Sequence, residues 1–208
     1  MLCKTIVNQT YNDVNCSGFK REARKNTTDF TRSRKMPFEE LVIFVLISLK
    51  CSTASALRRF FTNIRKSIFM TQQSLSEARN KLTVRAFVRL FKLTVNTMTE
   101  HCTNKWHGYR IYAIDGSKIS LPADKKLREH FGTLGKDKTA PKAQGSVLYD
   151  VLNDIVADAA IEPLTTDERT LAKIHIDACK NIAPDDKKLT IFDRGYASFD
   201  LIETLENG

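Results

Sequence analysis

The chain has 208 residues, of which 42% are hydrophobic and 27% charged, values typical of a soluble globular protein. Its five cysteines are scattered and form no C-x-x-C pair, which argues against a secreted disulfide scaffold and against a cysteine-rich zinc module. The longest apolar run, residues 41–49, is far shorter than the roughly 20 residues of a membrane span. We therefore expect a cytoplasmic protein with a core of its own.

The net charge of +9 is unevenly distributed along the chain. Residues 1–110 carry a net charge of +13 and residues 111–208 a net charge of −4. A basic half suits a polyanion, with nucleic acid first and an anionic membrane surface second. An acidic half can hold hard cations. Ordinary solvated surface charge remains the alternative for both halves.

The first half of the chain predicts helices after a polar start. Residues 1–35 are rich in Asn, Thr, Lys and Arg, and we expect a basic, weakly ordered arm. Helices are expected over residues 37–50, where Pro37 suits the first helical position, and over residues 55–64. The sequence Ser74-Leu75-Ser76-Glu77 matches the S-x-x-E capping box. It predicts a further helix that carries Leu82, Phe87, Leu90, Phe91 and Leu93.

The second half predicts a sheet with helices. Residues 122–141 are polar and rich in Lys, and we expect a long connection there. Strands are expected over residues 110–121, 146–150, 155–161 and 189–192, and helices over residues 167–182 and 199–205. A hairpin followed by a helical crossover and another strand gives a mixed sheet with helices packed against it. The fold class is therefore α+β, with a helical basic amino-terminal domain followed by a mixed sheet.

Two aspartates occupy similar places at the ends of apolar strands. Asp115 lies late in Ala113-Ile114-Asp115-Gly116-Ser117, and Asp193 follows Ile191-Phe192. A carboxylate at a buried strand end is costly unless its desolvation is offset, and a divalent cation can do so. If the two strands are neighbours, the carboxylates converge on one point. A turn or capping role is the alternative for each aspartate taken alone.

Three segments carry a family resemblance. The run from Trp106 to Ser117 (WHGYRIYAIDGS), with Leu121-Pro122 after it, resembles the first-aspartate segment of bacterial insertion-sequence transposases of the DDE type. Phe192-Asp193-Arg194-Gly195-Tyr196 resembles their second-aspartate segment, and the run from Ser76 to Leu82 (SEARNKL) resembles part of their DNA-binding region. This family has a ribonuclease-H-like fold and a late Y-x2-R-x3-E-x6-K signature.

The resemblance implies a set of functional expectations. Asp115 and Asp193 would be catalytic metal ligands for Mg²⁺ or Mn²⁺. The activity would be phosphodiester hydrolysis at transposon ends followed by strand transfer into target DNA. The expected partners are double-stranded DNA and a second copy of the chain on DNA, and the expected place is the bacterial nucleoid. The expected domains are a basic arm (1–35), a helical DNA-binding region (36–104) and a partial ribonuclease-H-like catalytic domain (105–208).

The sequence departs from the family pattern after Asp193. The third acid should follow a further strand and an inserted segment, and no Y-x2-R-x3-E-x6-K occurs before Gly208. Glu203 and Glu206 come too soon after Asp193 and fall on an expected helix, so we interpret them as surface residues. We therefore expect an incomplete sheet, a truncated transposase without its third acid, and little or no strand transfer by this chain alone.

Basic and amide side chains form the expected DNA-binding set. Residues 55–92 predict a helix-turn-helix, in which Gln can read adenine and Arg can read guanine in the major groove. An amphipathic helix with a solvated basic face is the alternative. Lys118 either follows DNA toward the first aspartate or belongs to a solvated loop, and Arg194 either contacts a phosphate or pairs with an acid. The candidate nucleic-acid-binding residues are Gln73, Arg79, Lys81, Arg85, Lys118 and Arg194.

Two other functions compete with the transposase interpretation. One is a non-catalytic DNA-binding protein that occupies transposon ends and regulates transposition. The other is a metal-dependent nuclease of the same fold. A zinc site at His101, Cys102 and His107 is not favoured, because their spacing fits no tight ligand pattern and no fourth ligand is evident.

Overall fold

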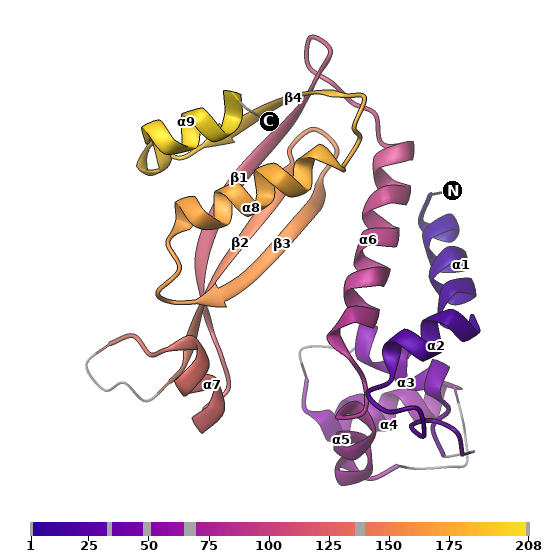
Figure 1. Ribbon diagram of the computed structural model, residues 1–208. Helices are drawn as coiled ribbons and strands as arrows, with labels where there is room; N and C mark the ends of the chain where they lie inside the picture. Colours follow the sequence, from indigo (N-terminus) through magenta and orange to yellow (C-terminus); the bar gives the residue numbers. More distant parts are fainter. Residues whose placement is uncertain (1, 33–34, 48–50, 65–69, 136–139, 207–208) are drawn as a thin grey trace. The chain divides into compact units, whose positions relative to one another are not determined.

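The computed structural model describes residues 2–32, 35–47, 51–64, 70–135 and 140–206. The chain divides into two compact units, residues 1–94 and 95–208 (Figure 1). Each unit is treated by itself below. The predicted domain boundaries at 35/36 and 104/105 stay predictions. Within the described ranges, no helix combines the length and the apolar character that a bilayer span requires.

The first unit is helical. Its elements are α1 (Leu2–Val14), α2 (Ser17–Ala23), α3 (Phe38–Leu46), α4 (Thr53–Ile64), α5 (Gln72–Arg79) and the beginning of α6 (Val84–His101). Helices α3 and α4 confirm the two expected over residues 37–50 and 55–64, except that α3 ends at Leu46 and residues 48–50 lie outside the described ranges. Its core contains Phe19, Leu41, Phe61, Leu75 and Leu90.

The amino-terminal segment is more regular than its composition suggests. Residues 1–35 contain α1 and α2, and Phe19 and Ala23 are fully buried in the helical core. Arg89 on α6 forms ion pairs with Asp13 and Glu22 and thereby holds both helices. The expectation of a weakly ordered arm, which rested on the polar composition, is therefore wrong. Burial of apolar side chains and these ion pairs stabilise the two helices.

The helix expected from Ser74 onward is two helices. The N-cap of α5 is Thr71, whose Oγ1 accepts a hydrogen bond from the Ser74 amide at 3.2 Å, so the capping-box prediction is wrong. Helix α5 ends at Arg79 because the next residues pair with the end of α2. There the Thr83 amide donates to the Ala23 carbonyl at 2.8 Å. A tertiary backbone contact thus replaces the helical hydrogen bonds between α5 and α6.

The second unit contains a four-stranded mixed sheet. Its elements after α6 are β1 (Tyr109–Ser120), α7 (Lys125–Phe131), β2 (Lys142–Asp150), β3 (Ile155–Pro163), α8 (Glu168–Lys180), β4 (Lys187–Phe192), a 3-10 turn (Arg194–Tyr196) and α9 (Phe199–Glu206). The strand order is β3-β2-β1-β4, with β2 antiparallel and β4 parallel to β1. This confirms the α+β class and the mixed sheet. The long connection expected over residues 122–141 contains a helix, α7, which Asp124 caps.

Helices α8 and α9 cover the same face of the sheet (Figure 1). The core on this face includes Tyr112 and Ile114 of β1, Leu148 of β2 and Ala172 of α8. Side chains alternate between the two faces of a strand, so the neighbouring residues point the other way. That face is partly exposed in the described part of the second unit, with Val147 37%, Val156 41%, Ile161 54%, Leu189 37% and Ile191 49% exposed.

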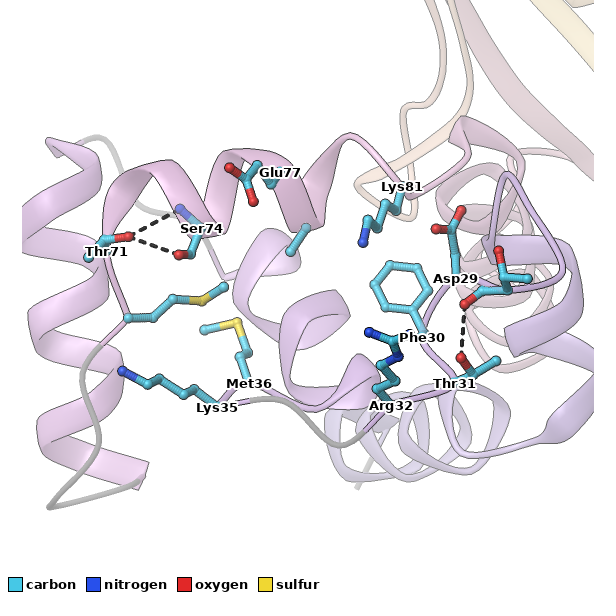
Figure 2. A pocket seen from close by; sticks show the side chains of 13 residues that line it. Asp29, Phe30, Thr31, Arg32, Lys35, Met36, Thr71, Ser74, Glu77 and Lys81 are labelled. Carbon is cyan, nitrogen blue, oxygen red and sulfur yellow. Dashed lines mark hydrogen bonds between the residues drawn. The ribbon is translucent and has the colours of Figure 1, made fainter.

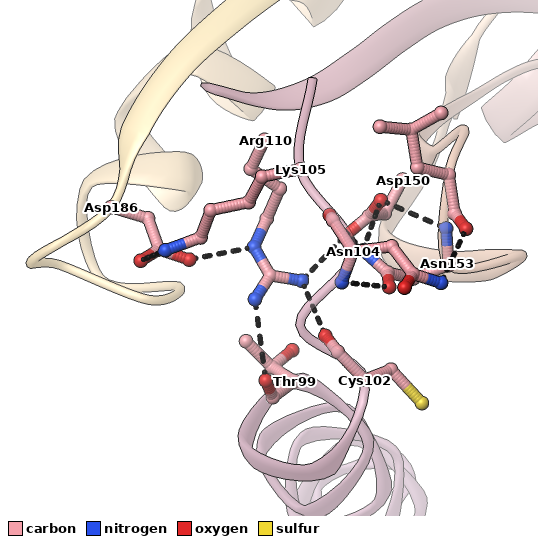
Figure 3. Close-up of polar contacts among 9 residues, drawn as sticks. Thr99, Cys102, Asn104, Lys105, Arg110, Asp150, Asn153 and Asp186 are labelled. Carbon is pink, nitrogen blue, oxygen red and sulfur yellow. Dashed lines mark hydrogen bonds and ion pairs between the residues drawn. The ribbon is translucent and has the colours of Figure 1, made fainter. Parts of the chain in front are cut away.

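A buried arginine joins β1, β2 and the segment before β4 (Figure 3). Arg110 is 1% exposed, and its guanidinium pairs with Asp150 at 2.7 Å and with Asp186 at 2.9 Å. It also donates to the carbonyls of Thr99 and Cys102 at the end of α6. These bonds fix the relative positions of the strands at the beginning of β1, five residues before Asp115.

Candidate functional site

The strand register brings Asp115 and Asp193 to one edge of the sheet. Strands β1 and β4 are parallel neighbours, and their pairing ends with Ile114 opposite Phe192. Asp115 is the next residue of β1, Asp193 directly follows β4, and both are exposed. The point at which the pairing of these parallel strands ends therefore places two acidic residues, 78 positions apart in the sequence, on neighbouring chain segments.

Each aspartate makes one local hydrogen bond to backbone. Oδ1 of Asp115 accepts from the Gly116 amide at 2.8 Å, and Oδ1 of Asp193 accepts from the Gly195 amide at 3.4 Å as the cap of the 3-10 turn. Neither takes part in an ion pair within the described part of the chain. The negative charge of both groups is thus available to a ligand.

Tyr196 lies beside these carboxylates. It is 3% exposed, and among the described residues its hydroxyl has no hydrogen-bond partner. Burial, and after it the charges of Glu168, Asp115 and Asp193 in that order, raise the pKa of Tyr196 to about 12. Three acidic side chains are therefore close enough to this phenol to disfavour its ionisation.

Glu168 and Gln144 are site residues that the sequence reasoning missed. Glu168 is the first residue of α8, and its Oε1 accepts a hydrogen bond from Nε2 of Gln144 at 3.3 Å. Gln144 is a buried residue of β2. The sequence carries no local signal for this arrangement, because a glutamate in the first turn of a helix is ordinarily explained by the helix dipole.

The residues present fit a divalent cation that keeps part of its hydration shell. Mg²⁺ is usually held by one or two carboxylates together with water and phosphate oxygens, which is what Asp115 and Asp193 offer. Within the described ranges, no group of three or more His, Cys, Asp and Glu side chains could hold a metal ion directly.

The first unit holds four of the predicted DNA-binding residues. Gln73 and Arg79 lie on α5, Lys81 in the turn after it, and Arg85 on α6. Nε2 of Gln73 donates to Oε1 of Glu77 at 3.4 Å. Figure 2 shows Lys81 pointing toward the ring of Phe30, and both line a cavity of about 590 Å³. Lys81 is therefore turned toward this cavity, whereas Arg79 and Arg85 are exposed.

The second unit holds the other two. Lys118 lies on β1, three residues after Asp115, and Arg194 begins the 3-10 turn directly after Asp193. Both side chains are exposed. They are basic neighbours of the two aspartates in the chain, and their binding role stays a prediction.

Comparison with known proteins gives one curated relative. No family model matches the chain. A protein of Escherichia coli, "Putative transposase InsZ", is 24% identical over 142 residues, which cover 65% of this chain and 46% of that protein. The chain is similar to a transposase over this region and spans less than half of that relative's length.

Proposed function

We propose that the chain is part of a DDE-type DNA transposase whose second unit is a ribonuclease-H-like domain. In this proposal Asp115 and Asp193 hold a divalent cation, Mg²⁺ or Mn²⁺, against a phosphate of the transposon end. The observation that carries it is the parallel pairing of β1 with β4, which ends immediately before both aspartates. The similarity to a transposase of Escherichia coli supports the DNA substrate.

The chemistry belongs to the point where the pairing of β1 with β4 ends. A divalent cation bound there supplies activation of the nucleophile and charge stabilisation at phosphorus. The protein contributes two carboxylates on neighbouring strands, which are held in register by the sheet. Both carboxylates are exposed, so a DNA backbone can reach them. Lys118 and Arg194 supply positive charge for the phosphates on either side.

The basic first unit is the proposed DNA-binding part. Residues 1–94 carry a net charge of +12, which favours a polyanionic partner through counterion release. In this unit Arg79 and Arg85 are exposed donors on consecutive helices. Gln73 and Lys81 complete the proposed contact set, with amide readout of a base by Gln73 and phosphate contact by Lys81.

Metal binding tests the proposal without requiring strand transfer. Manganese titration followed by electron paramagnetic resonance measures free Mn²⁺ and hence affinity. We expect Asp115→Asn and Asp193→Asn each to weaken Mn²⁺ binding at least roughly tenfold, because outer or inner ligands of a metal typically contribute that much. The matched control is Asp177→Asn, an exposed residue of α8 that pairs only with Lys180. Equal affinity in all four proteins would contradict the proposal.

A further inference from the structure

The carboxylate of Glu168 lies over β1 beside the first aspartate. A Cβ atom at Gly116 would lie 3.3 Å from both Cγ and Oε1 of Glu168, and 3.2 Å from Nε2 of Gln144. All three distances are shorter than an ordinary van der Waals contact. The absence of a side chain at position 116 is therefore what allows Glu168 to reach the strand directly after Asp115.

The hydrogen bond from Gln144 fixes this position. Gln144 is 3% exposed, and its backbone lies opposite Lys118 in the sheet. A buried amide that donates to a carboxylate orients it. Glu168 is nevertheless exposed as a residue. One of its oxygens is thus held by the protein while the side chain remains open to solvent.

Tyr196 provides an independent indication that a ligand belongs here. Its hydroxyl is buried and has no partner in the described part of the chain, and buried polar groups without partners are rare in folded proteins. The charges of Glu168, Asp115 and Asp193 all contribute to the raised pKa of this hydroxyl. A buried hydroxyl without a partner among the described residues therefore lies near all three acidic residues.

We propose that Glu168 is a third carboxylate of the metal site, which reaches the cation through a water molecule of its hydration shell. This inference rests on the proposed function of Asp115 and Asp193. A water-mediated contact agrees with the absence, among the described residues, of three acids placed to ligate one ion directly. It also suits Mg²⁺ and its reluctance to lose water. Glu168 is accordingly a positioning residue, which orients metal-bound water.

Substitutions of Glu168 test this role by metal affinity. We expect Glu168→Gln to weaken Mn²⁺ binding roughly tenfold, the lower end of what partners of a metal's ligands contribute. Glu168→Asp keeps the charge on a shorter side chain and should restore part of the affinity. Glu203→Gln, an exposed glutamate of α9, is the matched control and should leave affinity unchanged.

The outcomes separate the two proposals. Unchanged affinity in Glu168→Gln, together with weakened binding in Asp115→Asn, would overturn the role of Glu168 and leave the metal site intact. Unchanged affinity in both variants would overturn the metal site itself. Circular dichroism of each variant shows whether the fold is retained. If Glu168→Gln does not fold, Glu168→Ala takes its place, and an affinity equal to that of the unmodified protein would contradict the inference.

Discussion

Gly116 is the position where a single methyl group tests the geometry of the candidate site. The φ angle of Gly116 is not positive, so the backbone conformation does not require a glycine at this position. The constraint is the close approach of Glu168 and Gln144. We expect Gly116→Ala to displace the Glu168 carboxylate, to weaken Mn²⁺ binding severalfold, and to lower the free energy of unfolding by about 1 kcal/mol through local overpacking.

The chain offers a matched control for this substitution. A Cβ atom at Gly195 would have no neighbour within 4 Å, and Gly195 also lies next to the candidate site, two residues after Asp193. Urea unfolding and Mn²⁺ titration of Gly195→Ala should match those of the unmodified protein. If the two alanine variants bind Mn²⁺ equally well, the contact between Gly116 and Glu168 does not matter for the site.

The two aspartates could be predicted from the sequence, and the residues around them could not. Asp115 lies late in an apolar strand and Asp193 directly follows another, which is a local pattern, and parallel neighbouring strands bring such positions together. Glu168 reaches the site only because α8 begins over Gly116, which lies 52 residues earlier. The unpartnered state of Tyr196 is likewise a property of packing. Single-sequence patterns carry no information on either contact.

At the scale of the elements, Arg110 holds the strands in the register that pairs the aspartates. We expect Arg110→Met to lower the free energy of unfolding by about 3–5 kcal/mol, because it leaves the carboxylates of Asp150 and Asp186 without their shared cation. Arg128→Met on α7 removes an exposed arginine and should change stability little. Urea unfolding at neutral pH measures both, and equal stability of the two variants would contradict this account.

The same network predicts how stability changes with acid. The hydrogen bond from Lys105, and next that from Arg110, lower the pKa of Asp186 below its usual value. A carboxyl group whose pKa is lower in the folded state contributes stability above its unfolded pKa of about 3.9, and loses it as pH falls through the folded value. Stability should therefore decrease below about pH 4, and less steeply in Arg110→Met.

The sheet, helices α8 and α9 beside it, and helices α3 and α4 of the first unit were largely predictable, whereas α1, α2, α7 and the break between α5 and α6 were not. Strands β1 to β4 follow β-branched and aromatic runs, so their places were confirmed within a few residues. Helix α1 has a single buried residue, Val14. The break between α5 and α6 depends on pairing with the end of α2. Tertiary contacts of this kind override local helix propensity.

At the scale of the whole molecule, the uneven charge predicts salt-dependent DNA binding. Each phosphate contact contributes about one to the slope of log affinity against log salt. We expect the double substitution of Arg79→Ala and Lys81→Ala to reduce that slope by about two and to weaken binding to DNA that flanks the reading frame. Gel-shift titrations over a salt series measure it. Lys180→Ala, on α8, is the control, and an identical slope in the double variant would contradict the proposed contact set.

The most direct test of the account is to locate the cation. Crystals of the protein grown with MnCl₂ and a short duplex DNA can be measured at the manganese absorption edge, where anomalous density identifies the metal. We predict an anomalous peak between the carboxylates of Asp115 and Asp193, with the Glu168 side chain turned toward it. A peak elsewhere, or none in crystals where both aspartates are well ordered, would contradict the central claim.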